Sequence, residues 1–581
     1  MKPIYRIALL LFGIAILAGV LVWQLQQPEG ARGKSPALPI TMGDDPENQL
    51  AQDLALTDGR VIDYTAGRRA EVFSILEVGS HYPASAAACA DSDCRQVDIY
   101  NFDENFTLSV IVDIEDREVL EVLHQPGILA VANKRMVDVA IRIIREAPEV
   151  IAELGYQPAV ENVYPMPASL AGTECGSTHP CVAANFQLGD RIFWAHVDLT
   201  TETLAGTGWS PAPAEDWETV SYVPQGCPPS GSVNRDGWEL DHSVTASDGL
   251  RLADVTFNGV PVLTSVKLVE WHADYGSSGF VDATGCGGGG GGKFSIFPYG
   301  DTQVLDILDD NQNVIGFEVV QDFRMSSWGQ TCNYRYEQHD QFYLDGRFRI
   351  VGGAYGKGCG TNSMYRPLIR IDLAVGGDAG DLFSTWDGSV WVDRLTEFWL
   401  LQSPPYTLEN YAWKVTDQIS QQGYYIEPGQ GQFGDGGRGD DAFIYVVQHH
   451  AAEGDANMSA VGSCCNNNQQ QGPDTFLNSE SINGQNIVLW YVPQFQTDVT
   501  PGKEYCWTIQ GEPNPITYPC FGGPMFHPFS LPITPTVTPS ATATATATST
   551  ATSTPTPTAT MTPGPPPDNW IYLPIAPKDW Q

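Results

Sequence analysis

The tyrosines and aspartates of this sequence include two candidates for chemistry. One is Tyr334, which follows Asn333 in the stretch TCNYRYEQHDQFYLDGRFRI. Aromatic and polar residues alternate there up to Asp345-Gly346, which predicts two antiparallel strands joined by a turn. A tyrosine in such a strand usually lies in the core with its hydroxyl group hydrogen-bonded. A reactive role therefore needs a further signal.

The second candidate is Asp282, which precedes Cys286 and a run of glycines at 287–292. Burial would raise the pKa of its carboxyl group and suit it to act as a general base. The alternative is an aspartate that begins a Gly-rich turn, and both interpretations stay open here. The glycines lack the strand and helix that flank a phosphate-binding loop.

Histidines would be the natural ligands of a transition metal near these residues. Those between positions 238 and 530 are His242, His272, His339, His449, His450 and His527. None has the His-x-His spacing that puts two imidazoles on one face of a strand. His339 could line the pocket of Tyr334, although a surface position is commoner for a histidine.

An ordered series of motifs resembles those of the copper amine oxidases. The stretch from Thr331 is similar to that family's T-x-x-N-Y-[DE]-Y motif, but it is one residue shorter at Cys332 and has Arg335 in place of the acid. Residues 249–276 resemble its G-L-x-[IL]-x-x-V-x-[YF]-x-G-x-P-V-L stretch, and residues 486–507 resemble its D-[IV]-V-x-W-Y segment. Asp282 matches the aspartate of its F-D-x-G-[DE]-Y-G segment. The resemblance covers residues 238 to 530.

The resemblance implies roles for these residues. In the family, the tyrosine matching Tyr334 becomes topaquinone beside copper, and the aspartate matching Asp282 is the base in oxidising primary amines. Asp282 and Tyr334 are thus the implied catalytic positions, and Asn333 and Tyr334 form the cofactor motif. The copper positions fall on Ser363, Tyr365 and Gln496 or Thr497. These are poor copper(II) ligands, and Arg335 adds a positive charge, so we expect neither copper nor topaquinone.

Three functions remain open from the sequence. The favoured one is a degenerate, copper-free family member that serves as a binding or structural module. The second is an active amine oxidase with a rebuilt metal site, which would use copper, topaquinone from Tyr334 and a primary amine. The third is another enzyme that reuses the Asp282 pocket. The family resemblance also implies a homodimer.

The composition predicts a mainly β architecture, since aromatic residues, 58 glycines and 42 prolines accompany few helical patterns. The resemblance implies a large antiparallel β-sandwich over residues 206–530. Residues 59–205 predict one small α+β domain, similar to the cystatin-like domains that precede the catalytic domain in the family. Its amphipathic helix at 133–154 should kink or end at Pro148.

The two ends of the chain and its cysteines indicate export. An apolar run at 7–23 makes residues 1–28 an expected membrane anchor, with a removed signal peptide as the alternative. Residues 29–58 read as a linker, 531–567 as a Thr/Pro-rich stalk and 568–581 as a C-terminal tail. The formal net charge of −39 argues against nucleic acid as a partner.

Twelve cysteines suit an oxidising location at the cell surface. The close pairs Cys89/Cys94, Cys175/Cys181 and Cys506/Cys520 are candidate disulfides. We expect most cysteines to be oxidised, with Cys332 as the leading candidate for a free thiol beside Tyr334. Cys464-Cys465 could bind a soft metal or form separate disulfides.

Overall fold

The computed structural model describes most of the chain between residues 37 and 531. The described ranges are 37–40, 45–78, 89, 92–129, 132–175, 178–211, 226–276, 278–286, 296–430, 437–458, 461, 469–509 and 515–531. The expected anchor, stalk and tail lie outside these residues, as do Cys464 and Cys465. Within them, no helix is both long and apolar enough to cross a membrane.

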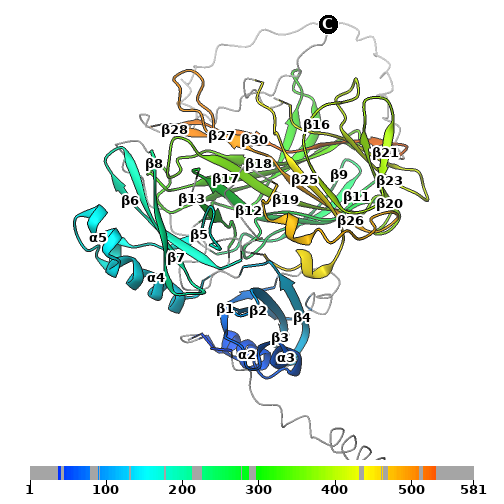
Figure 1. Cartoon of the computed structure of the whole chain (residues 1–581). Coiled ribbons are helices and arrows are strands. Elements are labelled where there is room, and N and C mark those ends of the chain that lie inside the picture. Colours follow the sequence, from blue (N-terminus) through cyan, green and yellow to red (C-terminus); the bar gives the residue numbers. More distant parts are fainter. Residues whose placement is uncertain are drawn as a thin grey trace, which may run out of the picture.

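A small four-stranded antiparallel sheet with two helices lies below the rest of the molecule (Figure 1). It contains α2 (Pro46–Ala55), α3 (Gly59–Thr65), β1 (Ala70–Glu77), β2 (Cys94–Asn101), β3 (Phe106–Asp113) and β4 (Glu118–Pro126). The Asp45 side chain caps α2 by accepting two backbone N–H groups. Ala51 and Ala55 of α2 are buried in the core of this unit. A packed helix therefore lies within the segment expected to be a linker.

The next elements belong to a different sheet. The expected amphipathic helix is divided into α4 (Lys134–Glu146) and α5 (Pro148–Leu154), because Pro148 ends the first and begins the second. After the short turn η3 (Val160–Asn162), the strands are β5 (Met166–Leu170), β6 (Cys181–Leu188), β7 (Arg191–Asp198) and β8 (Thr203–Pro211). The elements expected to form one unit over 59–205 are thus shared between two sheets.

The larger of two extended sheets has 14 strands in the order β22-β25-β26-β19-β12-β13-β5-β6-β7-β8, with β9, β10, β11 and β27 attached. Its further strands are β9 (Gly231–Arg235), β10 (Trp238–Val244), β11 (Leu250–Phe257), β12 (Val260–Asp274), β13 (Ser278–Asp282), β19 (Met364–Leu373), β22 (Phe398–Leu401), β25 (Phe443–Gln448), β26 (Ile487–Val492) and β27 (Phe495–Gln496). The turns η4 (Ala451–Glu453) and η5 (Pro473–Phe476) lie between β25 and β26.

The second extended sheet has 11 strands in the order β14-β16-β17-β18-β31-β24-β23-β20-β21, with β15 and β30 attached. They are β14 (Phe297–Pro298), β15 (Gln303–Leu308), β16 (Val314–Arg324), β17 (Arg335–Tyr343), β18 (Phe348–Ala354), β20 (Asp381–Trp386), β21 (Trp391–Arg394), β23 (Trp413–Asp417), β24 (Gly423–Glu427), β30 (Cys520–Gly522) and β31 (Met525–Phe529). A separate pair joins β28 (Trp507–Ile509) and β29 (Ile516–Tyr518).

The two extended sheets share the largest hydrophobic core. Trp271 and Ile369 reach it from one sheet, and Phe342 and Phe526 reach it from the other. The strand pairs in both sheets are antiparallel. The expected mainly β architecture with a large antiparallel β-sandwich is therefore confirmed.

All ten cysteines in the described part of the chain form disulfides. The bonds are Cys89–Cys94, Cys175–Cys181, Cys227–Cys286, Cys332–Cys359 and Cys506–Cys520. The three expected close pairs are confirmed. The expectation of a free thiol at Cys332 is wrong, because Cys332 forms a disulfide with Cys359. The spacing of the cysteines does not reveal this pair, because the two residues are distant in sequence.

Alkylation of the folded, unreduced protein should leave these ten cysteines unmodified. Export into an oxidising compartment keeps such bonds formed. Peptide mapping before and after reduction measures this, and reduced protein is the positive control. Substantial labelling of Cys332 or Cys359 in folded protein would contradict the pairing.

Candidate functional site

The alternation of β17 places neighbouring residues on opposite sides of the sheet. Tyr334, just before the strand, and Tyr336 are buried in the core between the sheets. Arg335 lies on the other face, where its guanidinium group contacts Asp322 at 3.0 Å and Glu337 at 2.5 Å. The expectation that Arg335 repels a cation beside Tyr334 is therefore wrong, because two carboxylates neutralise it across the sheet.

Four buried tyrosines, Tyr275, Tyr334, Tyr336 and Tyr365, form what we call the tyrosine cluster. The hydroxyl oxygens of Tyr334 and Tyr275 are 2.7 Å apart, and the Tyr275 oxygen also accepts the Cys359 backbone N–H at 2.7 Å. The Tyr334 hydroxyl donates to Cys359 Sγ at 3.4 Å. Burial raises the pKa of Tyr334 well above its usual value. The phenol of Tyr334 is therefore neutral, and its hydroxyl group is hydrogen-bonded to both Tyr275 and Cys359.

The backbone at Gly358 passes close to the cluster. A Cβ atom there would lie 2.3 Å from the Tyr365 hydroxyl oxygen and 2.4 Å from that of Tyr275. Only a glycine lets the chain approach so closely. The loop from Gly358 to Cys359 thus closes the space beside Tyr334.

Asp282 ends β13 and meets the cluster through Tyr336. The Tyr336 hydroxyl donates to Asp282 Oδ2 at 2.7 Å, and the Tyr336 ring stacks on Trp271 with ring centroids 4.1 Å apart. Burial raises the pKa of Asp282 to about 7, while the Tyr336 hydrogen bond opposes the shift. Its Oδ1 atom has no hydrogen-bond partner among the described residues. The structure therefore brings Asp282 and the Tyr334 region together through the intervening Tyr336.

Replacing Asp282 by asparagine should improve stability most at alkaline pH. The unfolded carboxyl loses its proton near its usual pKa of 3.8, whereas the folded one keeps it up to about pH 7. The folded state binds more protons between these values, so wild-type stability falls as pH rises through this window. The unfolding free energy of Asp282→Asn relative to wild type should rise by a few kcal/mol, since one pKa unit is about 1.4 kcal/mol.

Chemical denaturation of both proteins at pH 4.5 and pH 8 measures this difference. Asp309→Asn is the matched control, because hydrogen bonds from Asn313 lower the pKa of that exposed carboxyl group. The stability difference between wild type and Asp309→Asn should stay nearly constant over these two pH values, because both the folded and the ordinary pKa of Asp309 lie below 4.5. An unchanged difference between wild type and Asp282→Asn at the two pH values would refute the raised pKa.

The implied copper positions also lie together. Ser363 Oγ and Thr497 Oγ1 are 2.7 Å apart, and Gln496 Nε2 donates to the Ser363 carbonyl oxygen at 3.0 Å. Tyr365 lies beside Phe495 where β19 pairs with β27, and burial raises the pKa of Tyr365 to about 12. Two hydroxyls, a neutral phenol and an amide already bound to backbone do not fit copper(II).

The imidazoles of nearby strands point elsewhere. His272 on β12 pairs across the sheet with Arg366, whereas its neighbour Ala273 pairs with Tyr365. Its side chain therefore lies on the opposite face from Tyr365, where its Nε2 is 2.6 Å from Glu270 Oε1. His339 lies on the Arg335 face of β17, so it does not line the Tyr334 pocket. It is not a free surface histidine either, because it lies between the carboxylates of Glu318 and Glu337.

A different cluster has the spacing of metal ligands. Ligand atoms of Asp372, His449 and Asp455 lie within 4.8 Å of one another. Arg370 donates to Asp372 Oδ2 at 3.2 Å and to Asp455 Oδ1 at 3.0 Å. The guanidinium group thus already supplies the positive charge that these carboxylates require. Sequence reasoning missed this cluster because its members lie on β19 and a loop far along the chain.

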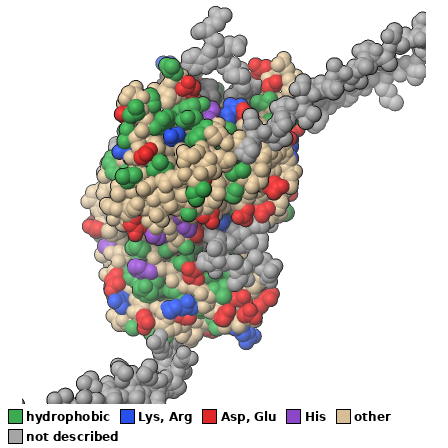
Figure 2. Space-filling model, turned by 90° about the vertical axis from the view of Figure 1, so that its right-hand side faces the viewer, with side chains coloured by type: hydrophobic (Ala, Val, Ile, Leu, Met, Phe, Trp, Pro, Cys, Tyr) green, Lys and Arg blue, Asp and Glu red, His purple; other side chains and the backbone are tan. Residues whose placement is uncertain are grey.

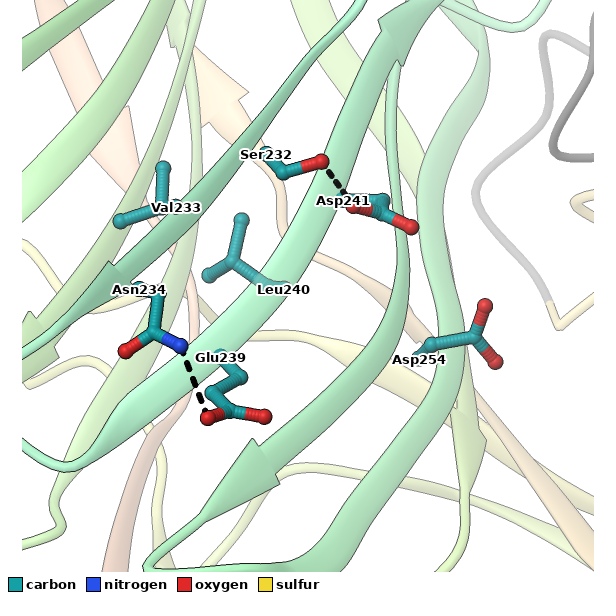
Figure 3. A pocket seen from close by; sticks show the side chains of 7 residues that line it. All are labelled: Ser232, Val233, Asn234, Glu239, Leu240, Asp241 and Asp254. Carbon is teal, nitrogen blue, oxygen red and sulfur yellow. Dashed lines mark hydrogen bonds between the residues drawn. The ribbon is translucent and has the colours of Figure 1, made fainter.

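A surface pocket lies on β9, β10 and β11 (Figure 3). Its lining residues are Ser232, Val233, Asn234, Glu239, Leu240, Asp241 and Asp254. Ser232 donates to Asp241 at 2.5 Å, and Asn234 donates to Glu239 at 2.8 Å. The lining offers carboxylates but no histidine, cysteine or lysine, and no sequence motif indicated it.

Comparison with known proteins gives a likeness of fold. No protein-family model matches the chain, and no curated protein matches it. Among solved structures, a copper-containing benzylamine oxidase from Hansenula polymorpha has a TM-score of 0.47 and 15% identity over 82% of this chain and 96% of that chain. Pichia pastoris lysyl oxidase has a TM-score of 0.46 and 13% identity over 86% and 92%.

An Aspergillus nidulans amine oxidase is similar at a TM-score of 0.45 and 11% identity, covering 86% of this chain and 90% of that chain. The resemblance to copper amine oxidases that the motifs predicted is thus found among solved structures as well. The chemistry of this chain depends on its own residues.

Proposed function

We propose that this protein is an exported amine oxidase-like protein that works without copper or topaquinone, as a binding or structural module at the cell surface. The five disulfides of the described part support export. The motifs support the family resemblance. In this account Tyr334 remains an ordinary tyrosine.

The observation that carries the proposal is the set of side chains at the implied copper position. Ser363 and Thr497 are hydrogen-bonded to each other, and Gln496 is hydrogen-bonded to the backbone. None of these three residues offers an imidazole to a metal. Copper(II) prefers several imidazoles in a tetragonal arrangement. Beyond its own members, the tyrosine cluster contacts Cys359, Asp282 and Trp271 through these hydrogen bonds and rings, and none of these described partners is a histidine.

The bonding of Tyr334 supports the same proposal. Its hydroxyl is shared between Tyr275 and Cys359 Sγ, and its ring lies 5.7 Å from that of Tyr336 by ring centroids. A reactive phenol would need a lowered pKa or an adjacent base, whereas burial here raises the pKa. These contacts favour a core tyrosine.

A copper titration with an absorption spectrum of the purified protein tests the proposal. We expect no stoichiometric copper and no quinone colour. His449→Gln is the matched control, since it removes the imidazole of the other donor cluster and with it any weak binding there. Tight binding of one copper per chain that survives in His449→Gln but is lost in Tyr334→Phe would favour the active oxidase with a rebuilt site.

A second candidate function is an enzyme that uses the Asp282 pocket, favoured by the pKa of about 7 and the free Oδ1 atom. Such a carboxyl group can exchange a proton near neutral pH. The family resemblance makes a primary amine the first ligand to test. It also implies that the enzyme would be a homodimer. Binding of benzylamine that is lost in Asp282→Asn would support this candidate over a purely structural role.

A further inference from the structure

The segment from Val390 to Leu401 contains an edge strand of each extended sheet. It contains β21, the last strand of the 11-stranded sheet, and β22, the last strand of the 14-stranded sheet. Thr396 between them bridges to Ser481, and the Arg394 guanidinium lies over the Phe398 ring at 5.3 Å. These contacts hold two strand ends of different sheets side by side.

The outer side of this segment is apolar. Val390 and Leu395 are each 56% exposed, and three further side chains complete what we call the apolar ridge: Val392, Trp399 and Leu401. Figure 2 looks on to the side of the molecule that carries β20, β21 and β23, and hydrophobic side chains gather in its upper part. Such a ridge is a common place for another surface to bind.

The strands beneath the ridge also offer free backbone groups. In the described part of the chain, β21 pairs only with β20 and β22 pairs only with β25. Natural proteins usually cover or charge an edge strand, because it can accept another strand. An extended peptide with alternating apolar side chains would satisfy both the backbone groups and the ridge.

The sequence contains an apolar segment beyond the described residues. The tail at 568–581 reads DNWIYLPIAPKDWQ, with apolar residues throughout Trp570–Ala576. The described chain stops at Leu531, just after β31, which is four strands from β21 in its sheet. Four strand spacings of about 4.8 Å amount to roughly 19 Å. The Thr/Pro tract at 532–567 is long enough to reach this far, since a Pro-rich chain of that length spans up to roughly 110 Å at about 3.1 Å per residue.

We propose that the tail segment Trp570–Ile575 of the same chain binds along β21 and the apolar ridge. The tether makes this binding intramolecular, with an effective concentration in about the millimolar range. The tail then protects the edge, and any outside partner of the ridge must displace it. None of the residues around Tyr334 takes part, so this proposal stands apart from the copper question.

Hydrogen–deuterium exchange of the full-length chain tests the contact. The tail variant combines Trp570→Ser, Tyr572→Ser and Leu573→Ser, and its control is Met561→Ser in the Thr/Pro tract. We expect the amides of residues 391–401 to exchange at least about ten-fold faster in the tail variant, with β16 and β17 unchanged. Equal exchange in wild type and tail variant would overturn the proposal.

A surface variant gives an independent arm. Val392→Lys combined with Leu395→Lys should release the tail, so that trypsin cuts after Lys578 several-fold faster. Leu308→Lys is the matched control, because Leu308 is 45% exposed at the other end of the same sheet. Protection of 391–401 that depends on protein concentration would mean a second copy covers the ridge, and would also overturn the proposal.

Discussion

Replacing His339 by leucine should lower the free energy of unfolding by about 3–5 kcal/mol, since it leaves two buried carboxylates facing each other. The imidazole Nδ1 is 3.1 Å from Glu318 Oε2, and Nε2 is 3.0 Å from Glu337 Oε2. Burial alone would lower the pKa of His339, but its hydrogen bonds with both carboxylates raise it to about 10. The group is therefore an imidazolium at neutral pH.

The size of this effect should depend on pH. His339 has an ordinary pKa of 6.5 and a folded one of about 10, so its stabilisation is complete below pH 6.5 and is lost as pH rises through 10. Urea denaturation of wild type and His339→Leu at pH 6 and pH 10 measures it. The control is His450→Leu, which removes a 38%-exposed partner of Glu480 and should cost less than about 1 kcal/mol. A similar small cost for both variants would contradict the account.

Replacing Asp440 by alanine should cost about 3 kcal/mol or more, because three donors lose their buried acceptor. Asp440 Oδ2 accepts the Tyr491 hydroxyl at 2.7 Å and the backbone N–H groups of Gly523 at 3.0 Å and Gly429 at 3.2 Å. These donors come from β26 and from the chain beside β31 and β24, so one carboxyl group joins the two extended sheets.

Comparison with Tyr491→Phe tests the cause of this cost. That variant removes one donor and leaves the carboxyl group with two, so we expect a loss of about 1 kcal/mol. Thermal unfolding of both variants gives the ranking. An Asp440→Ala protein as stable as Tyr491→Phe would show that the backbone donors contribute nothing.

The sequence predicts well where local alternation or a specific residue governs the structure. The alternating stretch from Thr331 became β17 and β18, with the turn at Asp345-Gly346 between them. Pro148 ended its helix as its missing N–H group requires. Ser363 and Thr497, which the resemblance assigns to the copper position, are in direct contact, while their role stays a prediction.

Contacts between distant segments could not be predicted in this way. Arg335 forms an ion pair with Asp322 on a neighbouring strand. Cys332 forms a disulfide with Cys359 across an intervening hairpin. Tyr275 holds the Tyr334 hydroxyl although nothing in the sequence links the two residues. Helix α2 was missed because its polar, acidic sequence resembles a linker. Only the packing of Ala51 and Ala55 against the apolar face of the small sheet shows that the segment is part of the fold.

The chemical state of Tyr334 is the central claim. Peptide mass spectrometry after exposure of the folded protein to copper and oxygen tests it most directly, on the reduced peptide that contains Tyr334. The account predicts an unmodified tyrosine in both treated and untreated protein, with Tyr334→Phe as the reference. Added oxygen on Tyr334, together with colour that reacts with phenylhydrazine, would contradict the account and make an active quinone oxidase the leading function.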